Sequence, residues 1–384
     1  MTTRTTGWVP PTETERLLYE ARAAGDEAAG IGVLSRAKLF LPTGRLYADT
    51  PGATAPFTPV KDPENGKWSV HVRTAGMLQP WHPDWVHLSV TLAELARVWP
   101  NASWRLAVNS GTPCAISLKA KPSHRQAWLK AGNESGGPPR GLLVAYAGGP
   151  SHGALAHGLA CGAHLSLHNS VAWNELGTTY FDYRRDAASL REVWRVTNRA
   201  QYADKLEELY GARLCGWEEA IALNSRAALH EHLGRAPSEA EWQDALAKAP
   251  ALHRADAETV AEVRWTAGRI ARYEERFRAD GILTAGERVD SLRAFDYGRI
   301  ISFVRMGLGA RLTEPGPAEE AVLAAGRLSR ETYNSWEAFS AAYALARVLA
   351  FDDGEFGRTY QESVAQHRIL TQDLKSPYRS LPWS

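Results

Sequence analysis

One ten-residue segment limits most strongly how this chain can fold. Residues 132–141 contain four glycines and two prolines. Such a segment cannot form a regular helix or strand, because glycine leaves the backbone unconstrained and proline removes a hydrogen-bond donor. We therefore expect a linker here. It separates a domain at 1–131 from a second domain at 142–375, which is followed by a loose tail at 376–384.

Length and composition agree with two globular domains. The 384 residues are enough for two domains of typical size. Hydrophobic residues make up 44% and charged residues 23%, which are ordinary globular values. A net charge of +1 gives no general attraction to nucleic acid or to an anionic membrane, so we expect neither partner. Residues 1–140 contain 16 Lys and Arg against 11 Asp and Glu, which indicates two differently charged surfaces.

Cysteine usage and the N-terminus favour a cytoplasmic protein. Cys114, Cys161 and Cys215 are few and widely spaced, which is typical of a reducing compartment. Residues 1–11 lack the apolar region of a signal peptide. No apolar run approaches the roughly 20 residues that a membrane span needs. We expect no membrane insertion and no cofactor, and the sequence does not define an oligomeric state.

The first domain has the pattern of an α+β fold with a small mixed sheet. Helices are predicted over 12–24, 91–99 and 123–131, and strands over 31–41, 68–73, 104–108 and 114–118. Residues 50–65 are rich in Pro, Thr and Gly and predict a loop. Residues 142–147 fit one more strand, which either domain could own.

The second domain reads as all-α. Helices are predicted over 217–233, 256–280, 292–308, 335–351 and 355–373. Ser238 and Glu241 have the spacing of a capping box, and Ser335 is a capping serine.

Gly149-Pro150-Ser151-His152-Gly153 matches the G-x-S-x-G pattern of a nucleophile elbow. In a serine hydrolase this turn raises the serine above a sheet, and further strands supply an acid and a histidine. The chain after Ser151 predicts helices and no such sheet. Because this sheet is not predicted, a serine hydrolase that uses Ser151 is kept only as the alternative function.

Cys161, His164 and His168 are spaced to lie on one face of a helix. Thiolate and imidazole groups can bind zinc, but a structural site has four ligands and no companion cluster is visible. A partly buried polar helix face is the other interpretation, and we expect no metal.

Asp296, Arg299 and Arg305 are charged residues within an apolar segment. Asp296 and Arg299 are three residues apart and can pair on a helix. Such a group forms either a structural clamp between helices or the polar floor of a pocket.

Residues of about 12–120 resemble the SseB N-terminal domain. The features that carry this resemblance are the opening helix, the apolar segment 33–41, Val90-Thr91-Leu92-Ala93-Glu94-Leu95, and the Asn109-Ser110-Gly111 turn after 104–109. The turn lacks the proline that the family has.

Residues of about 150–352 resemble the helical bacterial family called domain of unknown function 1266. The carrying segments are 194–199, 295–299, Arg305-Met306-Gly307 and 335–339, with Tyr343 and Arg347. Phe295 and Ala346 stand where the family often has Trp and Gly. The resemblance implies an architecture and no mechanism. Relatives near secretion and toxin–immunity systems imply an accessory, immunity or chaperone-like role.

We therefore expect a non-catalytic binding or regulatory protein whose helical domain binds a protein partner or a small ligand. Charges among apolar helices and the lack of a catalytic motif support this expectation. The candidate binding residues are Trp194, Arg199, Asp296, Arg299, Arg305, Trp336 and Arg347.

Overall fold

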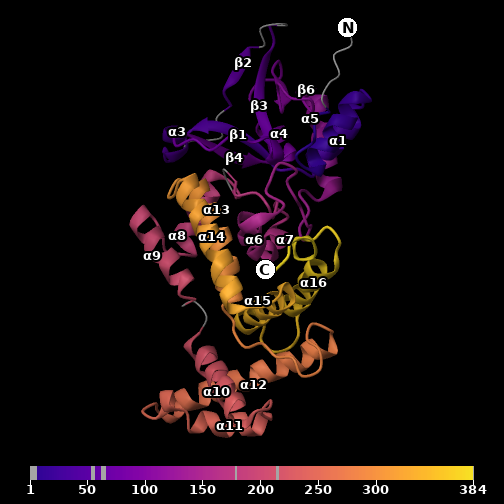
Figure 1. Cartoon of the computed structure of the whole chain (residues 1–384). Helices are drawn as coiled ribbons and strands as arrows, with labels where there is room; N and C mark the ends of the chain where they lie inside the picture. Colours follow the sequence, from indigo (N-terminus) through magenta and orange to yellow (C-terminus); the bar gives the residue numbers. More distant parts are fainter. Residues whose placement is uncertain (1–6, 53–56, 62–65, 178–179, 213–215, 384) are drawn as a thin grey trace. The chain divides into compact units, whose positions relative to one another are not determined.

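A mixed β-sheet and many helices make up the computed structural model, which describes residues 7–52, 57–61, 66–177, 180–212 and 216–383. The chain divides into two units (Figure 1). The first unit comprises residues 1–149, 169–202 and 304–318, and the second comprises 150–168, 203–303 and 319–384. Both units are discontinuous in sequence, whereas the sequence predicted contiguous domains. The boundary at 132–141 stays a prediction.

The sheet of the first unit confirms the small mixed sheet predicted from the sequence. Its strands are β1 Leu39–Gly44, β2 Pro59–Lys61, β3 Trp68–Thr74, β4 Trp85–Val90, β5 Arg105–Val108 and β6 Ile116–Lys119. Their order is β4-β1-β3-β5-β6, and β2 pairs with β3. Strands β3 and β5 run parallel, and the other neighbours run antiparallel.

Helices cover one face of this sheet. They include α1 Glu13–Ala23, α2 Glu27–Ser35, α4 Leu92–Val98 and α5 Pro122–Ser135, while α3 Arg45–Asp49 and α8 Tyr183–Glu192 also belong to the unit. Side chains alternate along a strand, so every second residue faces the helices. Val72 and Leu106 on the strands therefore form one buried core with Leu18 of α1 and Trp128 of α5.

The strand predicted over 31–41 is wrong in its first half. Residues 27–35 form α2, and β1 begins only at Leu39. The side chain of Asp26 accepts a hydrogen bond from the backbone N–H of Ala29 at 2.9 Å, which caps the helix. Ile31 and Val33 favoured a strand by their branching, but burial of Leu34 in the core outweighs this preference.

Other differences concern short elements. Helix α5 continues to Ser135, four residues into the predicted linker, and ends at Gly136, whose φ of 68° suits glycine. Strand β2 lies within the predicted loop, and β4 was not predicted. The predicted strand over 142–147 forms a single bridge, between Val144 and Ala172.

The remainder of the chain is mostly helical, as the sequence predicted. These helices are α6 Gly153–Cys161, α7 Ala163–Asn169, α9 Arg199–Tyr210, α10 Trp217–Leu233, α11 Glu239–Ala247, α12 Ala257–Ala279, α13 Ala294–Gly309, α14 Pro315–Thr332, α15 Trp336–Phe351, α16 Arg358–Gln372 and α17 Pro377–Ser380. The capping box of Ser238 and Glu241 and the cap at Ser335 are confirmed. In the second unit α10, α11 and α12 pack together, and α15 packs against α16 (Figure 1).

The C-terminal segment, which the sequence predicted to be loose, is packed. Ser376 caps α17. Tyr378 and Leu381 are buried. Within the residues that the structure describes, no helix is long and apolar enough to cross a membrane.

Candidate functional site

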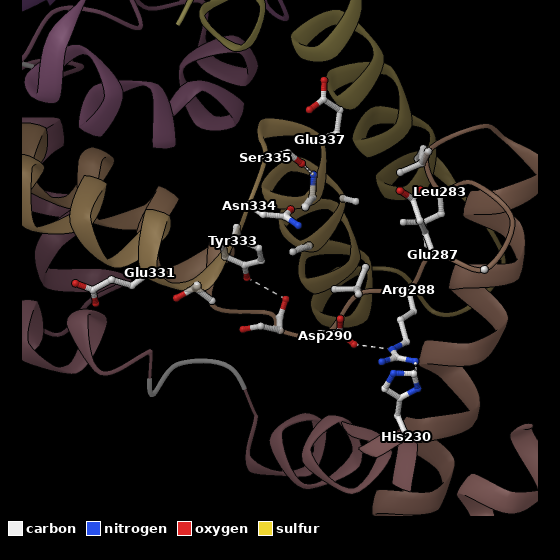
Figure 2. Close-up of a pocket in the computed structure, with 18 residues that line it drawn as sticks. His230, Leu283, Glu287, Arg288, Asp290, Glu331, Tyr333, Asn334, Ser335 and Glu337 are labelled. Atoms are coloured by element: carbon white, nitrogen blue, oxygen red, sulfur yellow. Dashed lines mark hydrogen bonds and ion pairs between the residues drawn. The ribbon is translucent and has the colours of Figure 1, made fainter. Parts of the chain in front are cut away.

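The second unit contains a cavity of about 680 Å³ (Figure 2). This volume lies in the range of sites that hold small ligands. The wall is formed by His230 near the end of α10, most of residues 282–291 between α12 and α13, residues 331–335 at the end of α14 and just after it, and Glu337, Ala338, Ala341 and Ala342 of α15. Four parts of the chain that are distant in sequence therefore build the site.

A buried ion pair holds one wall in place. Arg226 of α10 donates two hydrogen bonds to the carboxylate of Glu274 of α12, at 2.8 and 2.9 Å. The same pair holds the backbone of Val289. Arg226 donates to its carbonyl at 2.7 Å, and Glu274 accepts from its N–H at 2.8 Å. Because both charges are buried and satisfied, residues 282–291 are fixed at Val289.

A tyrosine holds the same wall two residues further along. The hydroxyl of Tyr333 donates to the carbonyl of Ser291 at 3.0 Å and accepts from the N–H of Ala294 at 2.8 Å. Figure 2 shows Tyr333 joined in this way to the segment that carries Asp290. The wall before α13 is thus attached both to α10 and α12 and to the junction between α14 and α15.

The cavity wall carries charges of both signs. Nε of Arg288 lies 2.7 Å from the carboxylate of Asp290, and Nη1 of the same guanidinium lies 3.2 Å from Nδ1 of His230 (Figure 2). Glu287 accepts a hydrogen bond from the backbone N–H of Thr284 at 2.6 Å. This bond lowers the pKa of Glu287 and keeps it ionised. The arrangement suits a polar ligand.

The hydroxyl groups of the wall already serve the fold. Ser335 accepts from the N–H of Ala338 at 3.0 Å as a helix cap, and Thr332 donates to the carbonyl of Leu328 at 2.8 Å. Tyr333 has the two backbone partners described above. Each of these three hydroxyl groups therefore has a backbone partner.

Trp336 lies behind the cavity and does not line it. Its ring is buried and stacks on Tyr378 with centroids 4.4 Å apart. Its indole N–H donates to the carbonyl of Leu381 at 3.0 Å, and the indole N–H of Trp383 donates to the carbonyl of Tyr333 at 2.9 Å. The C-terminal segment therefore supports the start of α15.

Asp296 and Arg299 form the predicted pair in α13, with 3.5 Å between carboxylate and guanidinium. Asp296 is fully buried. Arg299 lies over the ring of Phe295, 4.9 Å from its centroid. Neither charged residue lines the cavity.

Arg305 belongs to the first unit and anchors backbone. Its buried guanidinium donates to the carbonyls of Ala172, Trp173 and Glu175 at 3.0, 2.9 and 2.7 Å. Desolvation lowers its pKa. Residues 172–175 are not helical, so these contacts hold a connecting segment against α13, whereas the sequence left open a clamp between helices or the floor of a pocket.

The other predicted residues lie apart from the cavity wall. Trp194 is half-buried in the turn after α8. Arg199 forms an exposed ion pair with Glu314 at 3.2 Å. Arg347 of α15 pairs with Glu362 of α16 at 2.9 Å. The seven predicted binding residues are therefore divided between the two units.

Ser151 lies in the exposed turn before α6. Its Oγ is 3.3 Å from Nδ1 of the neighbouring His152. Gly153 has a φ of 80°, so the turn needs its glycine. The predicted strand before Ser151 is reduced to the bridge at Val144.

Cys161, His164 and His168 do not share one helix as predicted. Helix α6 ends at Cys161 and α7 begins at Ala163, and Gly162 between them packs against Ile301 with no space for a side chain. Cys161 donates to Ser329 at 3.3 Å, and His164 lies 2.9 Å from Ser340. Across the described ranges, no group of three or more His, Cys, Asp and Glu residues could hold a metal ion.

Sequence reasoning missed the cavity residues. His230 was not among the candidate residues, and 282–291 lies between the helices predicted over 256–280 and 292–308. The sequence signal was the combination of Gly286 with Glu287, Arg288 and Asp290 in one short connection. Charged residues in a loop held by a rigid scaffold are typical of binding sites.

A family model described as Protein of unknown function (DUF1266) matches residues 189–383. The matched region is just over half of the chain and includes every residue that lines the cavity. No curated protein and no solved structure matches the chain.

The match begins and ends later than the resemblance predicted from the sequence, and it includes the packed C-terminal segment up to Trp383. It does not reach residues 12–120, where the resemblance to the SseB N-terminal domain stays a prediction. The chain belongs to the DUF1266 family of proteins of unknown function.

Proposed function

We propose that this chain is a non-catalytic binding protein that holds a polar small molecule, or a segment of a protein partner, in the cavity of the second unit. One observation carries the proposal. The cavity wall is fixed at Val289 by Arg226 and Glu274, and at Ser291 by Tyr333. A wall that is already ordered reduces the entropy cost of binding.

An accessory role, such as regulation, immunity or chaperoning, follows from the resemblance to the DUF1266 family and belongs to the same proposal. The wall carries charges of both signs, which supports a ligand that has both hydrogen-bond donors and hydrogen-bond acceptors. The engagement of Ser335, Tyr333 and Thr332 with the backbone supports binding without chemistry.

Photo-crosslinking from inside the cavity tests this proposal. Ala338 lines the cavity and is half-buried. We would replace Ala338 by p-benzoylphenylalanine in the full chain, irradiate cells of the native host and determine the mass of each adduct. Ala227, exposed on α10 and absent from the cavity wall, is the matched control position.

We expect a discrete adduct from position 338 that is absent from position 227. The adduct mass separates a small ligand from a protein partner. Equal labelling from both positions, or no discrete adduct from position 338, would contradict the proposal.

The serine hydrolase alternative has its own test. A fluorophosphonate probe forms a covalent bond with an activated serine. Labelling of the wild type that disappears in Ser151→Ala would favour the hydrolase. We expect no labelling of either protein.

A further inference from the structure

The sheet of the first unit has a second face whose residues alternate with the core. Val70, Val72, Leu106 and Leu118 face the helices and are buried. Arg73 on β3, Arg105 on β5 and Lys119 on β6 therefore point to the opposite side. Lys119 is exposed, and the two arginines are half-buried. We call these three residues the basic face.

Within the described part of the sheet, no acidic residue compensates the charge of the basic face. The six strands of the sheet, as the structure describes them, contain no Asp or Glu. Among the described residues, Arg73, Arg105 and Lys119 have no ion-pair partner. Arg105 and Lys119 are direct cross-strand neighbours. Like charges directly opposite each other destabilise a sheet, so a counter-charge from outside the sheet would stabilise this pair.

Both arginines are held in place with donors to spare. Arg105 donates to the hydroxyl and the carbonyl of Ser117 at 2.8 and 2.9 Å. Arg73 donates to the carbonyl of Ser110 at 3.0 Å. A guanidinium has five N–H donors, so each arginine keeps several for a carboxylate.

The spacing of the charges suits an extended chain. Arg105 is the register neighbour of Ser69 on β3, and Arg73 lies four residues further along that strand. Four residues of a strand span about 13 Å. Carboxylates four residues apart on an extended peptide have the same separation and lie on the same side.

We propose that the basic face binds an extended acidic segment of a protein partner, with carboxylates on the Arg105–Lys119 pair and on Arg73. Charge complementarity selects this occupant. Nucleic acid fits less well, because a binding surface for single strands combines cations with aromatic rings. Across β3, β5 and β6 the residues on this face are Ser69, His71, Arg73, Arg105, Ala107, Ser117 and Lys119, with no Trp, Tyr or Phe. Phe40 of β1 is the cross-strand neighbour of Arg73, but its ring is buried and offers no surface for stacking.

Fluorescence anisotropy with the full chain tests the proposal. The probe is a labelled ten-residue peptide with glutamates at four-residue spacing. A peptide with glutamine in their place and a labelled single-stranded RNA are the comparison probes. The test variant is Arg105→Gln with Lys119→Gln. The control, Arg97→Gln with Lys130→Gln, changes the net charge equally at exposed positions of α4 and α5.

We expect the glutamate peptide to bind and the glutamine peptide not to bind. The Arg105/Lys119 variant should bind at least about fivefold more weakly, whereas the control should stay within about twofold of wild type. Circular dichroism would confirm that both variants fold. No binding of the glutamate peptide, or equal weakening in both variants, would overturn the proposal. Tighter binding of RNA that depends on Arg105 and Lys119 would replace the acidic segment by nucleic acid.

Discussion

Arg226 and Glu274 are the residues on which the cavity wall most depends. Their side chains are 7% and 3% exposed, so neither charge can be solvated if its partner is lost. Arg226 also lies over the ring of Trp242, 4.6 Å from its centroid. The pair therefore joins α10, α11 and α12 to the wall at Val289.

Removing one partner of this pair should destabilise the fold strongly. We expect Arg226→Met to lower the free energy of unfolding by about 3–5 kcal/mol, because the buried carboxylate of Glu274 would lose its two hydrogen bonds from Arg226 and keep only the N–H of Val289 and the longer contact with Arg278, at 3.8 Å. Urea denaturation measures the change. Arg235→Met removes the exposed ion pair with Glu241 and should have no measurable effect. If Arg226→Met lowers the free energy of unfolding as little as Arg235→Met does, the buried ion pair does not stabilise the fold.

Ser340 lies between two buried imidazoles in the second unit. Its Oγ is 2.9 Å from Nε2 of His164 and 2.9 Å from Nδ1 of His367. The single hydroxyl proton can be donated to only one of them, so the other imidazole donates its own N–H. Desolvation lowers the pKa of His367 to about 4 and that of His164 well below its usual range.

These histidines predict an acid-sensitive fold. Between about pH 6.5 and 4 the unfolded chain holds protons on the imidazoles that the folded chain does not, so the free energy of unfolding falls as pH falls through this window. For His367 the total is about 3 kcal/mol. Stability curves at several pH values should flatten in His367→Gln. They should keep the wild-type slope in the exposed control His232→Gln. An unchanged slope in His367→Gln would refute this assignment.

At the scale of elements, the close packing of α6 and α7 against α13 depends on the missing side chain at Gly162. A Cβ at this position would lie 2.6 Å from the Cβ of Ile301 in α13. We expect Gly162→Ala to destabilise the protein by about 1–3 kcal/mol, because a packed interior resists an added methyl group. Thermal or urea unfolding measures this change.

Gly268 provides the matched control in α12. The nearest atom to a Cβ built there is 3.9 Å away. Gly268→Ala should therefore be neutral or stabilise the helix by up to about 1 kcal/mol. If both substitutions stabilise the protein, the packing of α6 and α7 against α13 is not as tight as described.

The C-terminal segment is a second element with a testable role. Trp336 contacts Tyr378 and Trp383, so truncating its ring should leave a cavity under α17. We expect Trp336→Ala to cost about 3–5 kcal/mol. Trp265, which is 65% exposed, is the control, and Trp265→Ala should change stability little. A small effect of Trp336→Ala would mean that the segment is loosely attached.

Local signals explain which elements could be predicted. Helices with side-chain caps, such as those at Thr91, Ser238 and Asp256, were predicted to within a residue or two. The strand predicted at 31–41 failed because branched residues favoured a strand while packing of Leu34 decided for a helix. Strand β4 was missed although Val86, Leu88 and Val90 alternate with His87 and Ser89, which is the pattern of a half-buried strand.

At the scale of the whole molecule, the cavity could not have been predicted from local patterns. Its wall joins His230, the segment 282–291 and the start of α15, which are brought together only by tertiary packing. Four of the seven candidate residues selected from the sequence lie in the unit that contains the cavity. They include Trp336, which supports the site from behind, and Asp296 and Arg299, which lie in α13 and not in the wall.

The cavity of the second unit is the proposed binding site of the ligand. Once crosslinking has identified the ligand, its affinity should be measured by calorimetry for wild type, Ala338→Trp and Ala227→Trp. Ala338→Trp fills the cavity, and Ala227→Trp adds the same side chain on the exposed surface of α10. We expect at least about tenfold weaker binding to Ala338→Trp alone, a loss of about 1.4 kcal/mol. Equal affinities for the three proteins would contradict it.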